Sequence, residues 1–469
     1  MIFTSVFGFA NMPRAFYLMG YSAIPWYVLS ALLFFIPYAF MMAEYGSAFR
    51  KETGGIYSWM EKSIGPKYAF IGTFMWYASY IIWMVNVASS IWIPLSTAIS
   101  GFEKTSEWAL FGIFNSTQTL GILGALWILL VTFVATKGVE KIAKVTSVGG
   151  TAVALMNIIL LIGGIIVLIA NKGQFAQPMQ DVVASFIQSP NPSYQTPVTK
   201  LSFLTFAIFA FGGLEVLGGL VDQTENAKRT FPKGLTISAI VIADVLSSPN
   251  IHMSNVAYVI MQNLGIQLGL SFGLSTETSL ILGLWVARFV GISMFLAFTG
   301  AFFTLTYSPL KTLIEGAPKE IWPGKLGEIK DGMPINAMKI QASIVIAIIL
   351  VIAFGGKGAS EFFTLLVLMT NVAMTIPYVF LSSAFPSFKK KQLDGYIEKP
   401  FVIYKSYGIS ILASIIVSIV VGFANVFTII EPALNGQMHK TVTMILGPVI
   451  FSIIGFVLYY LYEKKYSSK

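Results

Sequence analysis

Long apolar runs, separated by short polar stretches, constrain this chain more than any other feature. Hydrophobic residues make up 56% of its 469 residues and charged residues only 11%, whereas a soluble globular chain carries roughly 25% charge. A helix needs about 20 apolar residues to cross the hydrocarbon of a bilayer, and many of these runs approach that length. The sequence therefore predicts an all-α polytopic membrane protein and excludes an ordinary soluble enzyme.

Twelve runs are candidate spans, and two of them are irregular. The seventh is long enough for only about 18 Å of helix, and the first begins about ten residues later than a full span would and is broken near Gly8. We therefore expect helix 7 to be short and helix 1 to be truncated at its N-terminus in this chain. The predicted spans cover residues 1–20, 25–43, 68–98, 119–135, 147–170, 201–221, 235–246, 280–307, 335–354, 361–386, 407–430 and 442–462.

Lysine and arginine are distributed unevenly over the predicted loops. If the chain crosses twelve times starting inside, 23 of its 30 basic residues lie on one side and five on the other. Because cytoplasmic loops are enriched in basic residues, both termini are expected in the cytoplasm. The net charge of +9 reflects this topology, so we expect no nucleic acid partner. The stretch 247–279 lacks lysine and arginine and is expected to be an external loop.

Glycines and polar residues interrupt two spans at comparable positions. Residues 5–11 in span 1 read SVFGFAN, and residues 209–215 in span 6 read FAFGGLE. These two spans run in opposite directions across the membrane. Interrupted helices at matching positions of two opposed halves indicate an inverted-repeat transporter with its site at mid-membrane. Packing of helices through small residues is the alternative, because glycine is common in membrane helices.

Three motifs resemble those of the amino acid–polyamine–organocation (APC) superfamily. Residues 209–232 (FAFGGLEVLGGLVDQTENAKRTFP) resemble its Gly-Gly-x-Glu signature and the Asn-x-x-Arg-x-x-Pro-like run that follows. Residues 41–66 (MMAEYGSAFRKETGGIYSWMEKSIGP) resemble its Ala-Glu, Gly-Gly-x-Tyr-x-Trp and Gly-Pro pattern, and residues 332–334 (GMP) resemble its Gly-x-Pro entry to span 9. Within the superfamily, the start of the chain and the loop after span 2 are most similar to bacterial glutamate/GABA antiporters.

The resemblance implies the twelve-helix LeuT-type fold, with a five-plus-five inverted repeat, broken helices 1 and 6 and two C-terminal helices. Residues 1–469 would form a single transporter domain, with repeats at about 1–170 and 201–386 and extra helices at about 407–462. The implied function is secondary transport of amino acids, or of amines derived from them, across the cytoplasmic membrane. Alternating access and exchange of the glutamate/GABA type would be the mechanism. The alternative is a non-transporting amino-acid-binding sensor or an inactive truncated permease.

The resemblance also implies a substrate site at the two helix breaks. In span 1, the backbone of the loop would contact the α-carboxylate of the substrate. In span 6, two glycines match the break, and a phenylalanine falls where related exchangers place an aromatic gate, although ordinary core packing accounts for it equally well. The residues carried over in this way are Thr4, Ser5, Phe7, Gly8, Phe209, Gly212 and Gly213.

Two charged residues within spans are further candidates, because ionisable groups in the membrane are costly and mark functional sites. Glu215 matches the glutamate of the family's span 6 and is expected to be a proton-sensitive or gating group. Its alternative role is to hydrogen-bond the unwound backbone of span 1. Arg288 in span 8 could bind an acidic substrate through two hydrogen bonds, pair with Glu215, or extend toward the membrane interface.

Span 3 presents aromatic residues at helical spacing. Tyr80 and Trp83 follow Trp76 on one face, which would line the substrate site or pack against neighbouring spans. Glu44, at the end of span 2, is expected to anchor a loop and not to contact a ligand.

No catalytic chemistry is indicated. The chain has no cysteine, its two histidines (His252 and His439) fall in predicted external loops, and no catalytic motif appears. We expect neither a cofactor nor a metal site. Span 5 lacks the interior lysine that replaces sodium in some family members, and Thr299 and Thr304 are the alternative as sodium ligands, so uncoupled exchange is favoured. The substrate and the oligomeric state are left open.

Overall fold

A computed structural model describes residues 15, 18–173, 181–213, 215–216 and 254–466. These residues form helices joined by turns, and the sheet-like pairing recorded among them is a single bridge between Lys330 and Met333. The all-α expectation is therefore confirmed for the described part of the chain. The expected first span, with Thr4, Ser5, Phe7 and Gly8, and the expected seventh span at 235–246 lie outside the described residues.

Eight helices or helix runs among the described residues are long and apolar enough to cross a membrane. They are Gly20–Ala48 (η1 Gly20–Ser22, α3 Ala23–Ser30, η2 Ala31–Phe35 and α4 Ile36–Ala48), Pro66–Ser100 (α6 Pro66–Ser90 and α7 Trp92–Ser100), α8 (Ser116–Ala135), α9 (Val139–Ala170), α14 (Thr276–Gly316), α15 (Ile335–Phe354), α18 (Tyr407–Leu434) and α19 (Met438–Tyr466). Shorter helices include α5 (Gly55–Ile64), α10 (Val182–Ile187), α11 (Pro197–Phe209), α13 (Ser254–Ser271), α16 (Gly356–Ala373) and α17 (Ile376–Leu393). A polytopic membrane protein is thus supported.

Local sequence signals explain where several helices begin. Asn115 caps α8 in a reciprocal arrangement with Gln118, in which each side chain bonds the backbone N–H of the other residue. Thr196 caps α11 directly before Pro197, and Ser275 caps α14. Such side chains satisfy backbone donors that have no partner within the helix, so each span has a defined starting point.

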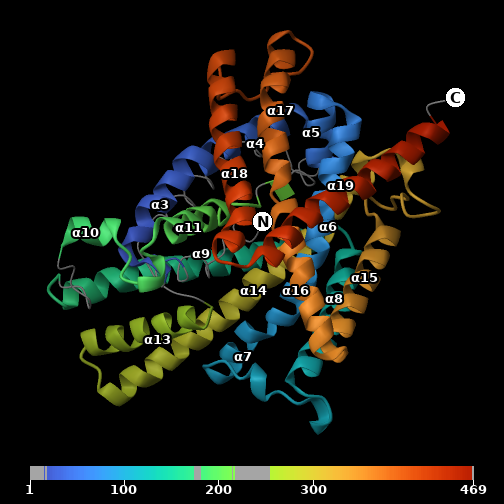
Figure 1. Ribbon diagram of the computed structural model, residues 1–469. Coiled ribbons are helices and arrows are strands. Elements are labelled where there is room, and N and C mark those ends of the chain that lie inside the picture. The colour runs from blue at the N-terminus through green and yellow to red at the C-terminus, as the bar shows by residue number, and fades with distance from the viewer. Residues whose placement is uncertain (1–14, 16–17, 174–180, 214, 217–253, 467–469) are drawn as a thin grey trace.

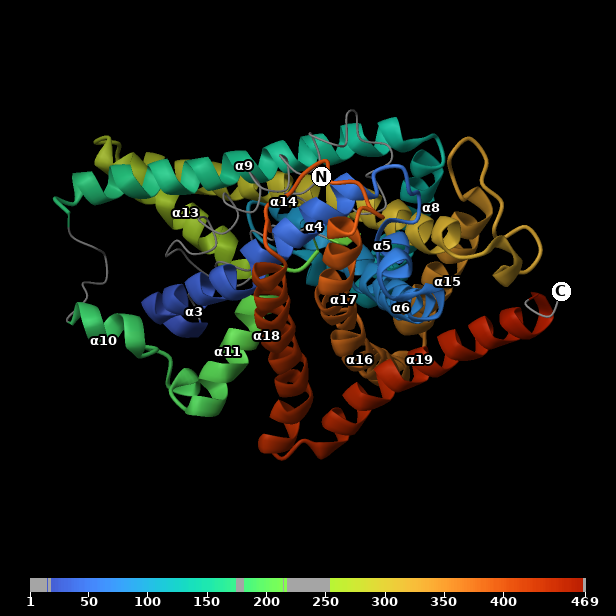
Figure 2. The same cartoon turned by 90° about the horizontal axis from the view of Figure 1, so that it is seen from above.

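The long helix α14 lies at the centre of the packing. It contacts α9 and α13 along one part of its length and α7 along another, and α9, α13 and α14 run side by side in Figure 2. Glycine allows the closest approach: a Cβ on Gly291 of α14 would lie 2.5 Å from the backbone nitrogen of Ala98 in α7. Small residues at such crossings are the usual device of membrane helix packing. Helix α19 packs against α16, α6 and α18, and its C-terminal end projects beyond the other helices in both views (Figure 1).

The expected external loop at 247–279 is wrong for its described residues 254–271. They form helix α13, which packs against α9 and α14. Tyr258 and Met261 of this helix are buried, and Gly163 of α9 closely approaches Leu264. The polar residues Asn255, Gln262 and Asn263 lower the apolar content of the segment, which is why a search for apolar runs missed it.

The expected continuous tenth span is also interrupted. Helix α16 ends at Ala373 and α17 begins at Ile376, so the predicted run 361–386 contains a break. Pro377 stands in the first turn of α17, where its missing N–H is tolerated, whereas in the middle of a helix it would remove a hydrogen bond. The break in span 6 is present as predicted: α11 ends at Phe209, and Gly213 has a φ of +114°.

A buried ion pair joins three distant segments on the side of the protein where α4 and α17 end. Lys389 Nζ lies 2.6 Å from Glu44 Oε2, and the two side chains are 1% and 0% exposed. Lys389 also donates to Gln392 Oε1 at 2.9 Å, and Glu44 Oε1 accepts from the backbone N–H groups of Ile403 and Tyr404 at 2.7 Å each. Glu44 therefore anchors the segment before α18, as its position at the end of span 2 predicted.

Candidate substrate site

A cavity of about 470 Å³ lies where the interrupted helices meet. This volume falls within the range of small-molecule sites, roughly 300–1,000 Å³. Its walls come from α6, from the end of α11 and the turn after it, from the junction of α16 and α17, and from single positions on α14 and α18. The lining residues are Ser79, Tyr80, Ile82, Trp83, Asn86, Phe209, Gly212, Gly213, Leu305, Val367, Thr370, Met374, Thr375, Tyr378 and Thr428.

The structure brings five of the candidate substrate-binding residues to this one cavity. The helical periodicity of α6 places Tyr80 and Trp83 on its wall, and the break after α11 contributes Phe209, Gly212 and Gly213. The two groups are separated in sequence by more than a hundred positions, so sequence neighbourhood does not explain their meeting. Their common location supports the sequence-based choice of these positions, while their contact with a substrate stays a prediction.

Glu215 is fully buried directly beneath the cavity wall. Its Oε1 accepts hydrogen bonds from Trp76 Nε1, Tyr80 Oη and Tyr378 Oη, each at 3.2 Å. Its Oε2 accepts from the backbone N–H of Gly213 at 3.2 Å. Four donors from α6, α17 and the span-6 break thus converge on one carboxyl group. Hydrogen bonds to a charged group are stronger than those between neutral groups, so this carboxyl can hold the three elements together.

Tyr378 is a site residue that the sequence reading missed. Its hydroxyl donates to Glu215 and accepts from the backbone N–H of Gly213 at 3.0 Å. A Cβ on Gly212 would lie 2.7 Å from the same hydroxyl, so only glycine leaves room for it. The available signal was the polar Thr370 and Asn371 followed by Pro377 within an apolar run, which indicates the helix break between Ala373 and Ile376.

The remaining polar lining residues mostly satisfy their hydroxyl groups within their own helices. Thr370 Oγ1 donates to Val367 O at 2.9 Å, and Thr428 Oγ1 donates to Ala424 O at 2.8 Å. Thr375 at the α16–α17 junction bonds to Asn425 of α18. Among the described lining residues none carries a formal charge, so the wall itself is polar and neutral.

Arg288, another candidate substrate-binding residue, does not line this cavity. Its guanidinium stands 5.1 Å from the ring centroid of Trp285, which is exposed on the outer surface of α14. Its Nε lies 3.6 Å from the position a Cβ on Gly101 would occupy, at the C-terminal cap of α7. A cation is favourable at a helix C-terminus, which accounts for this placement. The alternative pairing of Arg288 with Glu215 is not found, since the recorded partners of Glu215 are those given above.

The two threonines considered as sodium ligands bond to helix carbonyls. Thr299 Oγ1 donates to Phe295 O at 2.7 Å, and Thr304 Oγ1 donates to Gly300 O at 3.1 Å. Thr304 Oγ1 also lies 3.3 Å from Thr146 Oγ1 of α9. Within the described residues, no cluster of three or more histidine, cysteine, aspartate or glutamate side chains could hold a metal ion.

Comparison with known proteins defines the family. The amino acid permease family matches residues 1–459, and the chain therefore belongs to the amino acid permease family. This confirms the resemblance to the APC superfamily, and the name of the family implies an amino acid substrate.

Individual relatives agree with this assignment. The chain is 51% identical to the inner membrane transporter YjeM of Escherichia coli (strain K12), over 98% of this chain and 94% of that protein. It is 26% identical to the aspartate/glutamate permease AcaP of Lactococcus lactis subsp. cremoris, over 82% and 77% of the two chains. It is 24% identical to a glutamate/gamma-aminobutyrate antiporter of Lactococcus lactis subsp. lactis, over 93% and 84%. These relatives are named as transporters and permeases, not as enzymes.

Proposed function

We propose that this protein is a secondary transporter that exchanges amino acids across the bacterial inner membrane by alternating access. The observation that carries the proposal is the cavity at which the break after α11, the break between α16 and α17 and the aromatic face of α6 meet. Unwound backbone at membrane depth needs polar partners, and a bound substrate can supply them. The inner-membrane location is supported by the similarity to YjeM.

The residues of the cavity take distinct roles in this proposal. Gly212 and Gly213 form the bend of the wall that faces the polar end of the substrate, and Phe209 and Trp83 cover it. Thr4, Ser5, Phe7 and Gly8 of span 1 complete the site from the opposite half in the twelve-helix LeuT-type arrangement. Both termini lie in the cytoplasm, as the distribution of basic residues predicts.

Glu215 acts as a gating group in this scheme. Because it accepts hydrogen bonds from Tyr80, Tyr378 and the N–H of Gly213, any change in its bonding alters α6, α17 and the span-6 break together. Protonation would turn one of its oxygens into a donor and would force at least one of these hydroxyl or N–H partners to give up its bond. The substrate class within the amino acids rests on relatives of low identity; glutamate and GABA are therefore the first compounds to test.

The test is exchange in proteoliposomes. Purified protein is reconstituted around single unlabelled amino acids, including glutamate, GABA, glutamine and arginine, and uptake of labelled external substrate is measured. We expect uptake only with a particular internal partner, and we expect Phe209→Ala to reduce it strongly. Phe206→Ala is the matched control, since Phe206 lies on the same helix and packs on Phe203 outside the cavity lining.

The outcomes separate the alternatives. Equal uptake into liposomes with and without internal amino acid would refute exchange and indicate uniport. Binding of an amino acid without flux in any combination would refute transport and favour a sensor. Equal loss of uptake in Phe209→Ala and Phe206→Ala would show that the cavity assignment is wrong.

A further inference from the structure

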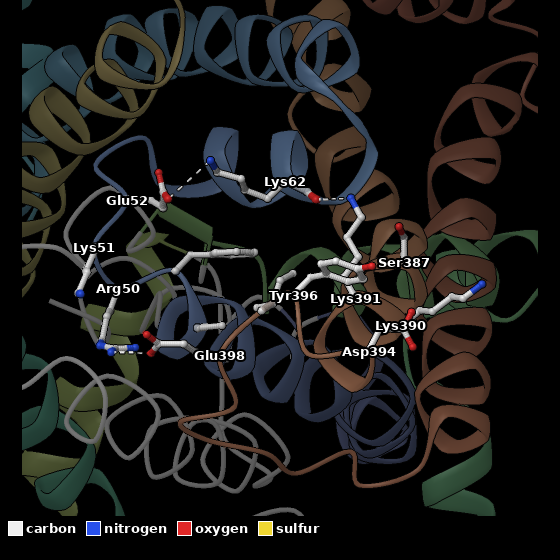
Figure 3. Close-up of a pocket in the computed structure, with 13 residues that line it drawn as sticks. Arg50, Lys51, Glu52, Lys62, Ser387, Lys390, Lys391, Asp394, Tyr396 and Glu398 are labelled. Atoms are coloured by element: carbon white, nitrogen blue, oxygen red, sulfur yellow. Dashed lines mark hydrogen bonds and ion pairs between the residues drawn. The ribbon is translucent and has the colours of Figure 1, made fainter.

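A second and larger cavity lies at the face that the positive-inside rule assigns to the cytoplasm. Its volume is about 800 Å³, and Figure 3 shows that its lining residues come from two parts of the chain. One wall comes from the end of α4, the turn that follows it and the last turn of α5. The other comes from the last turns of α17 and the loop behind it. We call it the cytoplasmic cavity, and it shares no lining residue with the substrate cavity.

The lining of the cytoplasmic cavity is strongly cationic. It carries five basic side chains against three carboxylates, so these groups alone leave an excess of two positive charges. The basic residues are Arg50, Lys51, Lys62, Lys390 and Lys391. An excess of positive charge in a concave surface attracts anions, and basic pockets on the cytoplasmic side of membrane proteins suit phosphate-bearing head groups.

Part of this charge is fixed in place by the protein. Arg50 Nη2 lies 2.7 Å from Glu398 Oε2, and Lys391 Nζ donates to the backbone carbonyl of Lys62 at 2.6 Å. The first bond connects Arg50 to the loop after α17, and the second connects Lys391 of α17 to the last turn of α5. They link the two walls of the cavity.

The remaining cations are available to a ligand. Lys62 makes only a long ion pair of 3.8 Å with Glu52, and both side chains are substantially exposed, so the pair is weak. For Lys51 and Lys390 no ion pair is recorded among the described residues, and they stand at opposite sides of the opening in Figure 3. Their four-carbon stems are flexible, so each ammonium group can turn over the mouth of the cavity.

The volume of the cytoplasmic cavity indicates the size of the ligand that it could hold. A volume of about 800 Å³ exceeds what one inorganic anion fills and matches the upper range of organic ligand sites. Tyr396, at the rim, is 83% exposed, and an exposed tyrosine suits both a membrane interface and an aromatic ligand. We propose that the cytoplasmic cavity binds the phosphate group of an organic ligand, with Lys51, Lys62 and Lys390 as the recruited cations. An anionic lipid head group and a soluble phosphate compound share this chemistry.

Such a ligand would contact both α17 and the α4–α5 turn. A ligand that touches two elements stabilises the conformation in which they lie together. Because α17 begins at Ile376 and its first turn carries Tyr378, which lines the substrate cavity, occupancy of the cytoplasmic cavity would be coupled to the position of this helix.

Two arms of one experiment identify the source of the phosphate. In the first, native mass spectrometry measures retention of phosphatidylglycerol against phosphatidylcholine by the purified protein. In the second, pyrophosphate is titrated at constant ionic strength, and binding is measured as a shift in the thermal unfolding midpoint. Selective retention in the first arm assigns a lipid head group, and a saturable shift in the second assigns a soluble compound.

The variant Lys51→Gln/Lys390→Gln tests the cavity itself. Each lysine near a phosphate contributes roughly fivefold in affinity, so we expect binding in the responsive arm to weaken by about 25-fold. The matched control is Lys325→Gln/Lys339→Gln, which removes two exposed lysines from the same predicted face outside the cavity and should bind as the unmodified protein does. An unchanged unfolding midpoint without probe confirms that the variants fold. Binding in neither arm, or equal weakening in both double variants, would overturn the proposal.

Discussion

Replacing Lys389 with methionine should strongly destabilise the junction of α4, α17 and the segment before α18. Methionine fills similar space but removes the ammonium group that lies 2.6 Å from Glu44 Oε2 and 2.9 Å from Gln392 Oε1. Since Glu44 is 0% exposed, water cannot replace the lost partner. Removing one member of a buried ion pair costs about 3–5 kcal/mol, which is roughly a 10²- to 10⁴-fold change in the unfolding equilibrium.

A second variant separates the lost charge pair from lost packing. In Glu44→Gln/Lys389→Met both charges are absent, and the glutamine Oε1 can still accept from the N–H groups of Ile403 and Tyr404. The loss should then fall to about 1–2 kcal/mol, the scale of ordinary hydrogen bonds. The double variant is therefore expected to be more stable than Lys389→Met alone. Lys390→Met, at the exposed neighbouring position, should change stability by no more than about 0.5 kcal/mol.

Denaturant titration in mixed micelles gives the free energies of unfolding, and hydrogen exchange at Ile403 and Tyr404 reports on the anchored segment. These two amides should lose protection in Lys389→Met and largely regain it in the double variant. The reasoning fails if the free energy of unfolding of Lys389→Met lies within about 1 kcal/mol of that of the unmodified protein, because burying a carboxylate without its cation costs more than this. It also fails if adding Glu44→Gln makes the single variant less stable.

Two further predictions concern the site and the packing. Tyr378→Phe should slow exchange on the order of tenfold, because it removes one hydrogen bond to the Glu215 carboxyl group. The control is Tyr77→Phe, which loses a bond to Gln341 away from the cavity and should leave the exchange rate unchanged. Equal exchange rates for the two variants would contradict the role of Tyr378. Gly447→Ala should lower the free energy of unfolding by about 1–3 kcal/mol, since its Cβ would lie 2.0 Å from Met369 O. The control is Gly422→Ala, whose Cβ meets nothing within 4 Å and which should be neutral or slightly stabilising. A similar loss of unfolding free energy in both variants would show that the crossing of α16 and α19 is not tight.

Apolar run length predicted most of the helices because the membrane imposes it directly. The expected span 335–354 coincides with α15, and the expected span 119–135 differs from α8 only at its start. The run 147–170 was too short, because α9 begins at Val139 and its first turns carry Lys141 and Lys144, which a hydropathy criterion excludes. Helix α13 was missed because polar, uncharged residues interrupt its apolar sequence, and its burial comes from packing on α9 and α14.

Residues of the candidate site could be predicted from the sequence where one continuous segment contains the pattern that identifies them. The glycine pair after α11 and the aromatic periodicity of α6 led to Gly212, Gly213, Tyr80 and Trp83 without a structure, and the resemblance to the APC superfamily added Phe209. Tyr378 could not be placed, because its bond to Glu215 joins positions 163 residues apart. Arg288 was predicted from its sequence position but does not line the cavity. A charge within a span is a strong sequence signal, but here Arg288 lies at the end of α7 and against the ring of Trp285.

The way Glu44 holds the segment before α18 also determines which changes that segment tolerates over evolutionary time. The carboxylate binds two main-chain N–H groups, which every residue except proline provides. The side chain at position 403 can therefore drift among residues of similar polarity without loosening the anchor. Position 404 is more restricted, because Tyr404 Oη also donates to Pro37 O at 2.9 Å. Proline at either position would remove one of the two main-chain bonds to Glu44.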